Sequence, residues 1–200
     1  RMSVVKHLVF LLSLACSPLC FSAACPVSSS TIIEGNGDCT VTGSASTILL
    51  NFNSGFDSSA AVSAIDGNNG TTLGAQRKLS FIKAAEVISE SLNSSVTIEI
   101  DASFSDLECD TDEATLGSAG ANAYVYSTNS DSGLETATSY PVGLANAILD
   151  RDLYPNDSDI IAEFSRDLGD SDCLPSTSWY YGFGILSDRS RQTGFTSVLL

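Results

Sequence analysis

Histidine and basic side chains are scarce in this sequence. His7 is the only histidine among 200 residues, and nine Lys and Arg stand against 24 Asp and Glu, which gives a net charge of −15 at pH 7. Because Ser-His-Asp and Cys-His nucleophiles require an imidazole, the residues after His7 cannot form either unit. The acidic balance repels phosphate backbones, so we predict no nucleic-acid partner. The acidic balance is compatible with calcium binding or with a saline environment outside the cell.

Residues 1–24 have the layout of a secretory signal peptide. Lys6 and His7 form a basic start, an apolar run follows from Leu8 to Ala15, and the small residues 22–24 predict cleavage after Ala24. The run is shorter than the roughly 20 residues that span a bilayer, which disfavours a membrane anchor. A lipoprotein signal ending at a cysteine of this region is the alternative. We therefore expect a secreted, extracellular protein with no membrane span once the signal is removed.

Removal of the signal peptide changes two properties of the chain. It takes away His7 and two of the nine basic residues but none of the 24 acidic ones, so the charge becomes −17. Six cysteines become four, and the mature chain contains no histidine. The sequence therefore offers the mature protein no imidazole for catalysis or for metal binding.

Four cysteines remain in the mature chain: Cys25, Cys39, Cys109 and Cys173. An even number in an exported protein predicts disulfides. Of the three pairings that four cysteines allow, we favour Cys25–Cys39 across a short N-terminal hairpin and Cys109–Cys173 across a long loop. The second bond stabilises by about 4 kcal/mol in the chain-entropy treatment. A zinc site is the rival interpretation, but no two of these cysteines have CxxC spacing.

The hydrophobic patterns predict an α+β fold in which one mixed β-sheet packs against a long helix. The expected elements in chain order are a hairpin or tether (25–46), a buried strand (47–52), a long helix (72–92), a half-buried strand (96–104), a strand at the end of 115–126, a short helix (141–150), a strand (159–164) and a final helix that begins at Thr193 or Thr196. Thr72 is the expected N-cap of the long helix. The apolar stripe of that helix comprises Phe81, Ala85, Ile88 and Leu92. In the strand 96–104 the alternate residues point to one face: Val96, Ile98, Ile100, Ala102 and Phe104.

Two motifs near the start of the long helix allow a binding or a structural interpretation. DGNNGT (66–71) loosely resembles the start of a calcium loop, but no Glu follows at the EF-hand distance, so we favour an Asx-rich turn. GTTLGAQR (70–77) lacks the glycines and the Lys of a phosphate cradle, so we favour a helix cap. Arg77 is a candidate for a buried pair with a carboxylate.

For three further segments, a structural interpretation is simpler than a functional one. WYYGF (179–183) can line a binding groove, but aromatic residues that close a core are the commoner case. The acidic stretches 157–159 and 170–172 are typical of solvated loops. From its residues alone, the chain contains no catalytic or metal site that we can assign.

A set of segments in a fixed order resembles a known family. The segments are GTTLGAQR, KAAEVISESLNSSVTIEIDASF, LECD with ATLGSAGA, YPVGLANAILDRDL, DIIAEFSRDLGDSDCL, SWYYGF and FTSVLL. Together they resemble the N-terminal half of the catalytic domain of secreted, zincin-like bacterial metallopeptidases that carry a protease-associated (PA) domain. The resemblance covers about residues 48–200. The chain departs from the family at Gly184-Ile185-Leu186, where an Asp is usual, and at Phe164-Ser165-Arg166, where Phe-Asn-Ser is usual.

The resemblance implies a function for a longer protein. In the family, the apolar helix that begins at FTSVLL continues into His-Glu-x-x-His, whose histidines hold zinc and whose Glu activates the zinc-bound water. Residues 47–200 would then be a zincin- or metzincin-like upper subdomain that stops before this motif, and protein or peptide substrates are expected for the intact enzyme. No catalytic or metal-binding residue is carried over to these 200 residues. The alternative is a non-catalytic exported acidic module with an adhesion or calcium-binding role.

Overall fold

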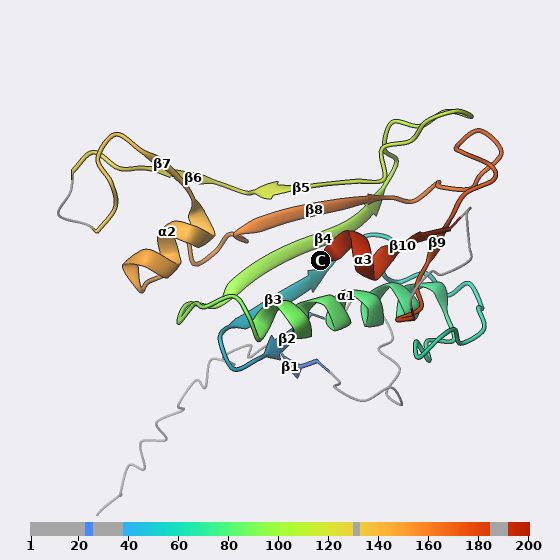
Figure 1. Ribbon diagram of the computed structural model, residues 1–200, viewed down its shortest axis with the longest axis horizontal. Coiled ribbons are helices and arrows are strands. Elements are labelled where there is room, and N and C mark those ends of the chain that lie inside the picture. Colours follow the sequence, from blue (N-terminus) through green and yellow to red (C-terminus); the bar gives the residue numbers. More distant parts are fainter. Residues whose placement is uncertain (1–22, 26–37, 130–132, 185–191) are drawn as a thin grey trace, which may run out of the picture.

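The computed structural model describes residues 23–25, 38–129, 133–184 and 192–200. The expected signal peptide lies outside these residues except for Ala23 and Ala24, as does the part 26–37 of the expected tether. The fold is α+β, with a six-stranded mixed sheet and one long helix (Figure 1). The fold class expected from the sequence is therefore confirmed.

The main sheet has the strand order β1-β2-β3-β4-β8-β5. Its strands are β1 (Ala23–Ala24), β2 (Cys39–Thr42), β3 (Thr47–Phe52), β4 (Ile98–Ser105), β8 (Ile160–Ser165) and β5 (Gly117–Ala121). The three central strands β3, β4 and β8 are parallel, while β2 is antiparallel to β3 and β5 is antiparallel to β8. Strand β5 therefore forms one edge of the sheet and runs against its neighbour.

The remaining elements lie beside the main sheet or beyond its end. They are α1 (Leu73–Ser89), α2 (Val142–Leu149), α3 (Phe195–Leu199), the pair β6 (Tyr124–Tyr126) and β7 (Ser139–Pro141), and the pair β9 (Ser178–Tyr180) and β10 (Gln192–Gly194). Figure 1 shows α1 running along the sheet and β6, β7 and α2 projecting beyond its end. We call β6, β7 and α2 the lobe.

Helix α1 begins and ends through local hydrogen bonds. The Thr72 hydroxyl accepts a hydrogen bond from the Ala75 N–H at 3.2 Å, so Thr72 is the N-cap that the sequence predicted. At the other end, the N–H groups of Ser91 and Leu92 both donate to the Ile88 carbonyl. The helix is therefore shorter than expected, and Leu92 lies beyond it with 49% of its surface exposed instead of continuing the apolar stripe.

The core lies between α1 and one face of the sheet. The register places apolar residues of neighbouring strands side by side on this face: Ile48 with Ile98, Leu50 with Ile100, Ala102 with Ala162, and Phe104 with Phe164. The opposite face is polar at its centre, where the Asn51 amide donates to Glu99 at 2.6 Å and to Asp101 at 2.8 Å. The strict alternation read from residues 96–104 therefore separates a buried face from a hydrated one.

Two expected boundaries differ from the structure. Residues Cys39–Thr42 do not form part of a separate tether, because as β2 they pair with β3 in the main sheet. The final helix begins at Phe195, since Thr193 belongs to β10, which pairs with β9. Residues of β10 thus hold the start of α3 against the centre of the molecule.

Candidate functional site

Strand β5 offers free backbone hydrogen-bonding groups at the edge of the main sheet. The Leu116 carbonyl accepts from Ser165 N–H and the Asn122 N–H donates to the Asp159 carbonyl, both at 2.9 Å. In an antiparallel pair, residues that hydrogen-bond to the partner strand alternate with residues whose N–H and C=O groups point away from it. Since positions 116 and 122 bond toward β8, Gly117, Ala119 and Ala121 turn their N–H and C=O groups away from β8. Figure 1 shows β5 along the upper margin with no strand beyond it. Such an edge can pair with another extended chain.

A groove adjoins β5 on the α1 side of the sheet. This inner groove has a volume of 380 Å³ and an apolar lining that comes from α1, from the strands β3, β4, β5 and β8, and from the end of α3. Ala84 and Ile88 contribute from α1, Leu116 from the start of β5, and Val198 and Leu199 from α3. Val198 is 43% exposed there. The end of α3 therefore borders an apolar space that the described residues leave open.

A second hollow lies at the other end of β5, against the lobe. This outer hollow has a volume of 470 Å³. Its lining is predominantly apolar and includes Leu92, Ile98, Ala121, Tyr124, Leu144, Ala147 and Ile160. Ala119 and Ile160 line both the inner groove and the outer hollow. The two spaces are therefore neighbours along β5.

Phe195 fixes α3 at the centre of the core. Its side chain is fully buried, and its ring centroid lies 5.0 Å from that of Phe164 and 5.3 Å from those of Phe104, Trp179 and Tyr181. Edge-to-face ring pairs at such distances stabilise beyond the area that they bury. The segment 179–183 thus closes the core, which confirms the structural interpretation, and it positions α3 beside the inner groove.

Arg77 links this aromatic centre to α1 and to the loop after β3. Its Nε donates to the Tyr181 hydroxyl at 3.1 Å, its Nη1 donates to the Gly55 carbonyl at 2.6 Å, and its guanidinium lies 3.7 Å from the centroid of the Phe104 ring. The partners are thus a carbonyl, a hydroxyl and a ring, instead of the carboxylate that we considered. Burial raises the pKa of Tyr181 although the Arg77 charge opposes the shift, so the hydroxyl stays protonated.

The loop 66–71 is built into the same centre. Asn68 is fully buried, and its amide donates to the carbonyls of Gln76 and Tyr181 at 2.9 and 2.8 Å. Its side-chain oxygen accepts from the Gly70 N–H, which is the Asx turn that we favoured. Asn68 thus docks the loop against α1 and against Tyr181, which follows β9.

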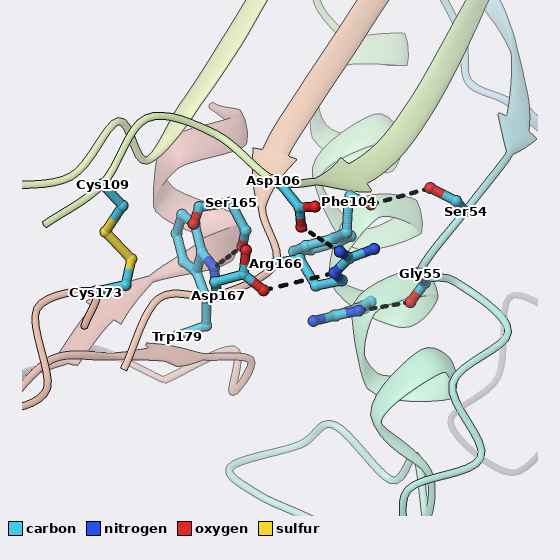
Figure 2. A network of polar contacts seen from close by, with 11 residues as sticks. Ser54, Gly55, Phe104, Asp106, Cys109, Ser165, Arg166, Asp167, Cys173 and Trp179 are labelled. Carbon is cyan, nitrogen blue, oxygen red and sulfur yellow. Dashed lines mark hydrogen bonds and ion pairs between the residues drawn. A yellow bond between two sulfur atoms is a disulfide. The ribbon is translucent and has the colours of Figure 1, made fainter. Parts of the chain in front are cut away.

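The end of β4 and β8 opposite the lobe is braced by covalent and ionic links (Figure 2). Cys109 and Cys173 form a disulfide with a Cα–Cα distance of 5.2 Å, and Arg166 pairs with Asp106 and Asp167. The Trp179 indole donates to the Ser165 carbonyl at 2.8 Å. These links join the connection before β5 to the connection after β8, so they fix where β5 begins.

The second disulfide lies at the far edge of the main sheet. Cys25 and Cys39 are bonded with a Cα–Cα distance of 4.8 Å, and both are buried. Both pairings that the sequence favoured are therefore present. Two disulfides are typical of proteins from an oxidising environment.

Asp159 anchors the lobe to the main sheet. Its carboxylate accepts from the Glu99 N–H and from the Asn146 amide, both at 2.9 Å. Burial raises the pKa of Asp159, which is only 5% exposed. The acidic stretch 157–159 is therefore only partly the solvated loop that we expected, whereas 170–172 is exposed. The burial of Asp159 was not predicted, because its polar neighbours in the sequence gave no signal of it.

Lys78 is the unusual residue of the core. Its side chain is fully buried in α1, and its amine has no hydrogen-bond partner among the described residues. Burial lowers the pKa of Lys78, while the carboxylates of Asp57 and Asp38 oppose the shift. The Nζ atom lies 5.8 Å from the centroid of the Phe52 ring. This group costs stability in its charged form.

Neither a metal cluster nor a membrane-spanning helix is found among the described residues. Within residues 23–25, 38–129, 133–184 and 192–200, no cluster of three or more His, Cys, Asp or Glu side chains is arranged to hold a metal ion. None of the helices that the structure describes is long and apolar enough to cross a membrane. No protein family, curated protein or solved structure matches the chain.

Proposed function

We propose that this chain is part of a secreted zinc-dependent metallopeptidase, in which β5 binds the peptide substrate and the inner groove receives an active-site helix. The observation that carries the proposal is the position of α3. It lies on the α1 side of the main sheet, and Val198 and Leu199 border the inner groove beside the free edge of β5. A helix that continued α3 along this groove would therefore run next to a substrate paired with β5.

The lining of the inner groove supports a helix as its occupant. Apolar side chains of α1 such as Ala84 and Ile88 face those of the sheet across the groove. A helix that buries an apolar stripe between these surfaces gains the packing that a short helix needs, since helices below about 12 residues are marginal on their own. The resemblance supplies such a helix, because FTSVLL continues into His-Glu-x-x-His in the family.

The residues present do not fit a zinc ion. Cys25, Cys39, Cys109 and Cys173 are consumed by disulfides, and the described residues include no histidine. The proposal therefore assigns zinc binding and the activation of water to residues beyond these 200, and we derive no catalytic step here. The role of this chain is to hold the substrate and to support the helix that would carry the ligands.

The test is the product of the gene extended beyond Leu200. We expect the next codons to encode His-Glu-x-x-His, and the longer protein to bind one zinc per chain and to hydrolyse peptides in a chelator-sensitive manner. Ile88→Glu, which places a charge in the inner groove, should lower zinc occupancy, whereas Glu90→Lys just beyond the end of α1 should not. A polar linker or a stop after Leu200 would favour the non-catalytic exported module instead.

A further inference from the structure

We propose that β5 selects extended peptides in which a large apolar residue is flanked by basic residues. The apolar side chain enters the outer hollow, and the basic side chain that pairs beside Ser118 reaches Glu163 on the opposite face of the sheet. The inference rests on the proposed function in one respect, namely that β5 is the strand that receives the peptide. It adds the substrate class, which the resemblance does not supply.

The geometry of β5 decides which side chains of a bound strand meet the hollow. Ala119 and Ala121 turn their backbone groups outward, and they lie opposite Ala162 and Ile160 on the α1 face. Residues that face each other in paired strands place their side chains on the same side of the sheet. A peptide residue paired with Ala119 or Ala121 therefore points to the α1 side, where the outer hollow opens.

The outer hollow accepts an apolar group. Its rim carries Leu92 and Leu144, each 49% exposed, and Tyr124, which is 63% exposed. The carboxylate in its lining, that of Asp159, already accepts hydrogen bonds from Asn146 and from the sheet. The volume of 470 Å³ is ample for an aromatic or a large aliphatic side chain.

The opposite face of β5 is suited to a basic group. Ser118 lies beside Glu163, and a side chain added at Gly120 would meet no atom within 4 Å, so the space above β5 is open. Among the residues that the structure describes, the Glu163 carboxylate accepts one long hydrogen bond, from the Ser105 hydroxyl at 3.3 Å. Peptide residues next to the apolar one point to this face, because side chains alternate along a strand. A Lys or Arg there complements Glu163 and the net charge of −15.

The experiment measures the binding of fluorescent peptides to the exported chain with both disulfides intact. The probe is acetyl-Thr-Lys-Phe-Lys-Thr-amide with a fluorophore on an added N-terminal linker, and its binding is followed by fluorescence anisotropy. We expect replacement of Phe by Ala to weaken binding at least about tenfold, since a buried Phe side chain contributes that much. N-methylation of the Phe nitrogen should abolish binding, because it removes a hydrogen bond to β5.

Matched variants locate the two contacts. Ala147→Phe fills the outer hollow from α2 and should remove the preference for Phe, whereas Ile148→Phe, on the same helix but outside the lining, should keep it. Glu163→Gln should reduce the preference for Lys over Gln in the peptide by about threefold, in the range of an exposed charge pair. Glu90→Gln, at the end of α1, should not change that preference.

The outcomes separate this inference from the proposed function. Equal binding of the Phe and Ala peptides, or a preference that survives Ala147→Phe, overturns the inference even if the longer protein is a peptidase. Selective binding by this chain supports it, and does so even if the longer protein proves to bind no zinc, because the measurement does not depend on catalysis.

Discussion

The two halves of the main sheet are built in different ways. Around β3, β4 and α1, aromatic rings pack at centroid distances of 4.7 to 6.2 Å, and Phe52, Phe56, Phe104 and Phe195 are almost completely buried. Strand β5 consists of Gly, Ser and Ala, and Tyr124 and Tyr126 of the lobe are more than 60% exposed. The first half supplies stability, whereas the second half exposes backbone groups and apolar surface. The strand edge that we propose for peptide binding therefore lies in the half that contributes least to the core.

The largest effect that we predict is the loss of stability when the packing of the aromatic half is disrupted. Phe195→Ala removes a ring that contacts five others, so it should lower the free energy of unfolding by up to about 5 kcal/mol. Denaturant unfolding followed by circular dichroism measures the loss. Phe195→Leu, which retains most of the volume, should lose clearly less. Equal losses in the two variants would contradict the central role of the ring.

The second-largest effect that we predict concerns the disulfide between Cys109 and Cys173. Replacing Cys109 and Cys173 by Ser opens a loop of sequence separation 64, which costs about 4 kcal/mol in the chain-entropy treatment. Because this disulfide fixes the connection before β5, amide exchange should accelerate in β5 more than in β3. Opening the bond between Cys25 and Cys39, with a separation of 14, is the control and should leave β5 unchanged.

Much of the aromatic half can be predicted from the sequence, because its residues obey strong local rules. Thr72 capped the long helix as expected, and the alternation of residues 96–104 gave the correct buried face. The pairing of Cys109 with Cys173 was also correct. The helix cap and the alternation depend on hydrogen bonds and side-chain periods that a short window of sequence contains.

The candidate site could not be predicted to the same extent. The strand Gly117–Ala121 has almost no strand propensity, and only its pairing with β8 makes it a strand. Its position at an edge, and the meeting of Leu92, Tyr124 and Leu144 around the outer hollow, depend on contacts between distant segments. The burial of Asp159 depends on such contacts as well.

A smaller effect tests the buried amine of Lys78 in the aromatic half. Lys78→Met removes a buried amine without a partner among the described residues, so it should raise the free energy of unfolding by about 1 kcal/mol at pH 7. The pKa of Lys78 is lower in the folded than in the unfolded chain, so the wild type takes up a proton on unfolding and becomes more stable as pH rises toward 10.5. The advantage of the variant should therefore shrink above neutral pH. An advantage that grows with pH would contradict this assignment.

The smallest effect that we predict is the change in unfolding free energy caused by a substitution in the lobe. Tyr126→Ser in the lobe changes a side chain that is 62% exposed, so the free energy of unfolding should change by less than about 0.5 kcal/mol. Thermal unfolding of this variant beside Phe195→Leu measures the contrast. A large loss for Tyr126→Ser would show that the lobe contributes to the stability of the whole fold.

The free edge of β5 has a consequence for the behaviour of the protein in concentrated solution. Edge strands are commonly protected from pairing with one another by Lys, Pro or a bulge, and Gly117–Ala121 contains neither Lys nor Pro. The net charge of −15 keeps two copies apart at low ionic strength. Salt shortens the range of this repulsion from about 10 Å at 0.1 M to about 3 Å at 1 M. The colloidal stability of the protein therefore depends on ionic strength, and concentrated salt should promote edge-to-edge dimers that dissociate on dilution into low salt.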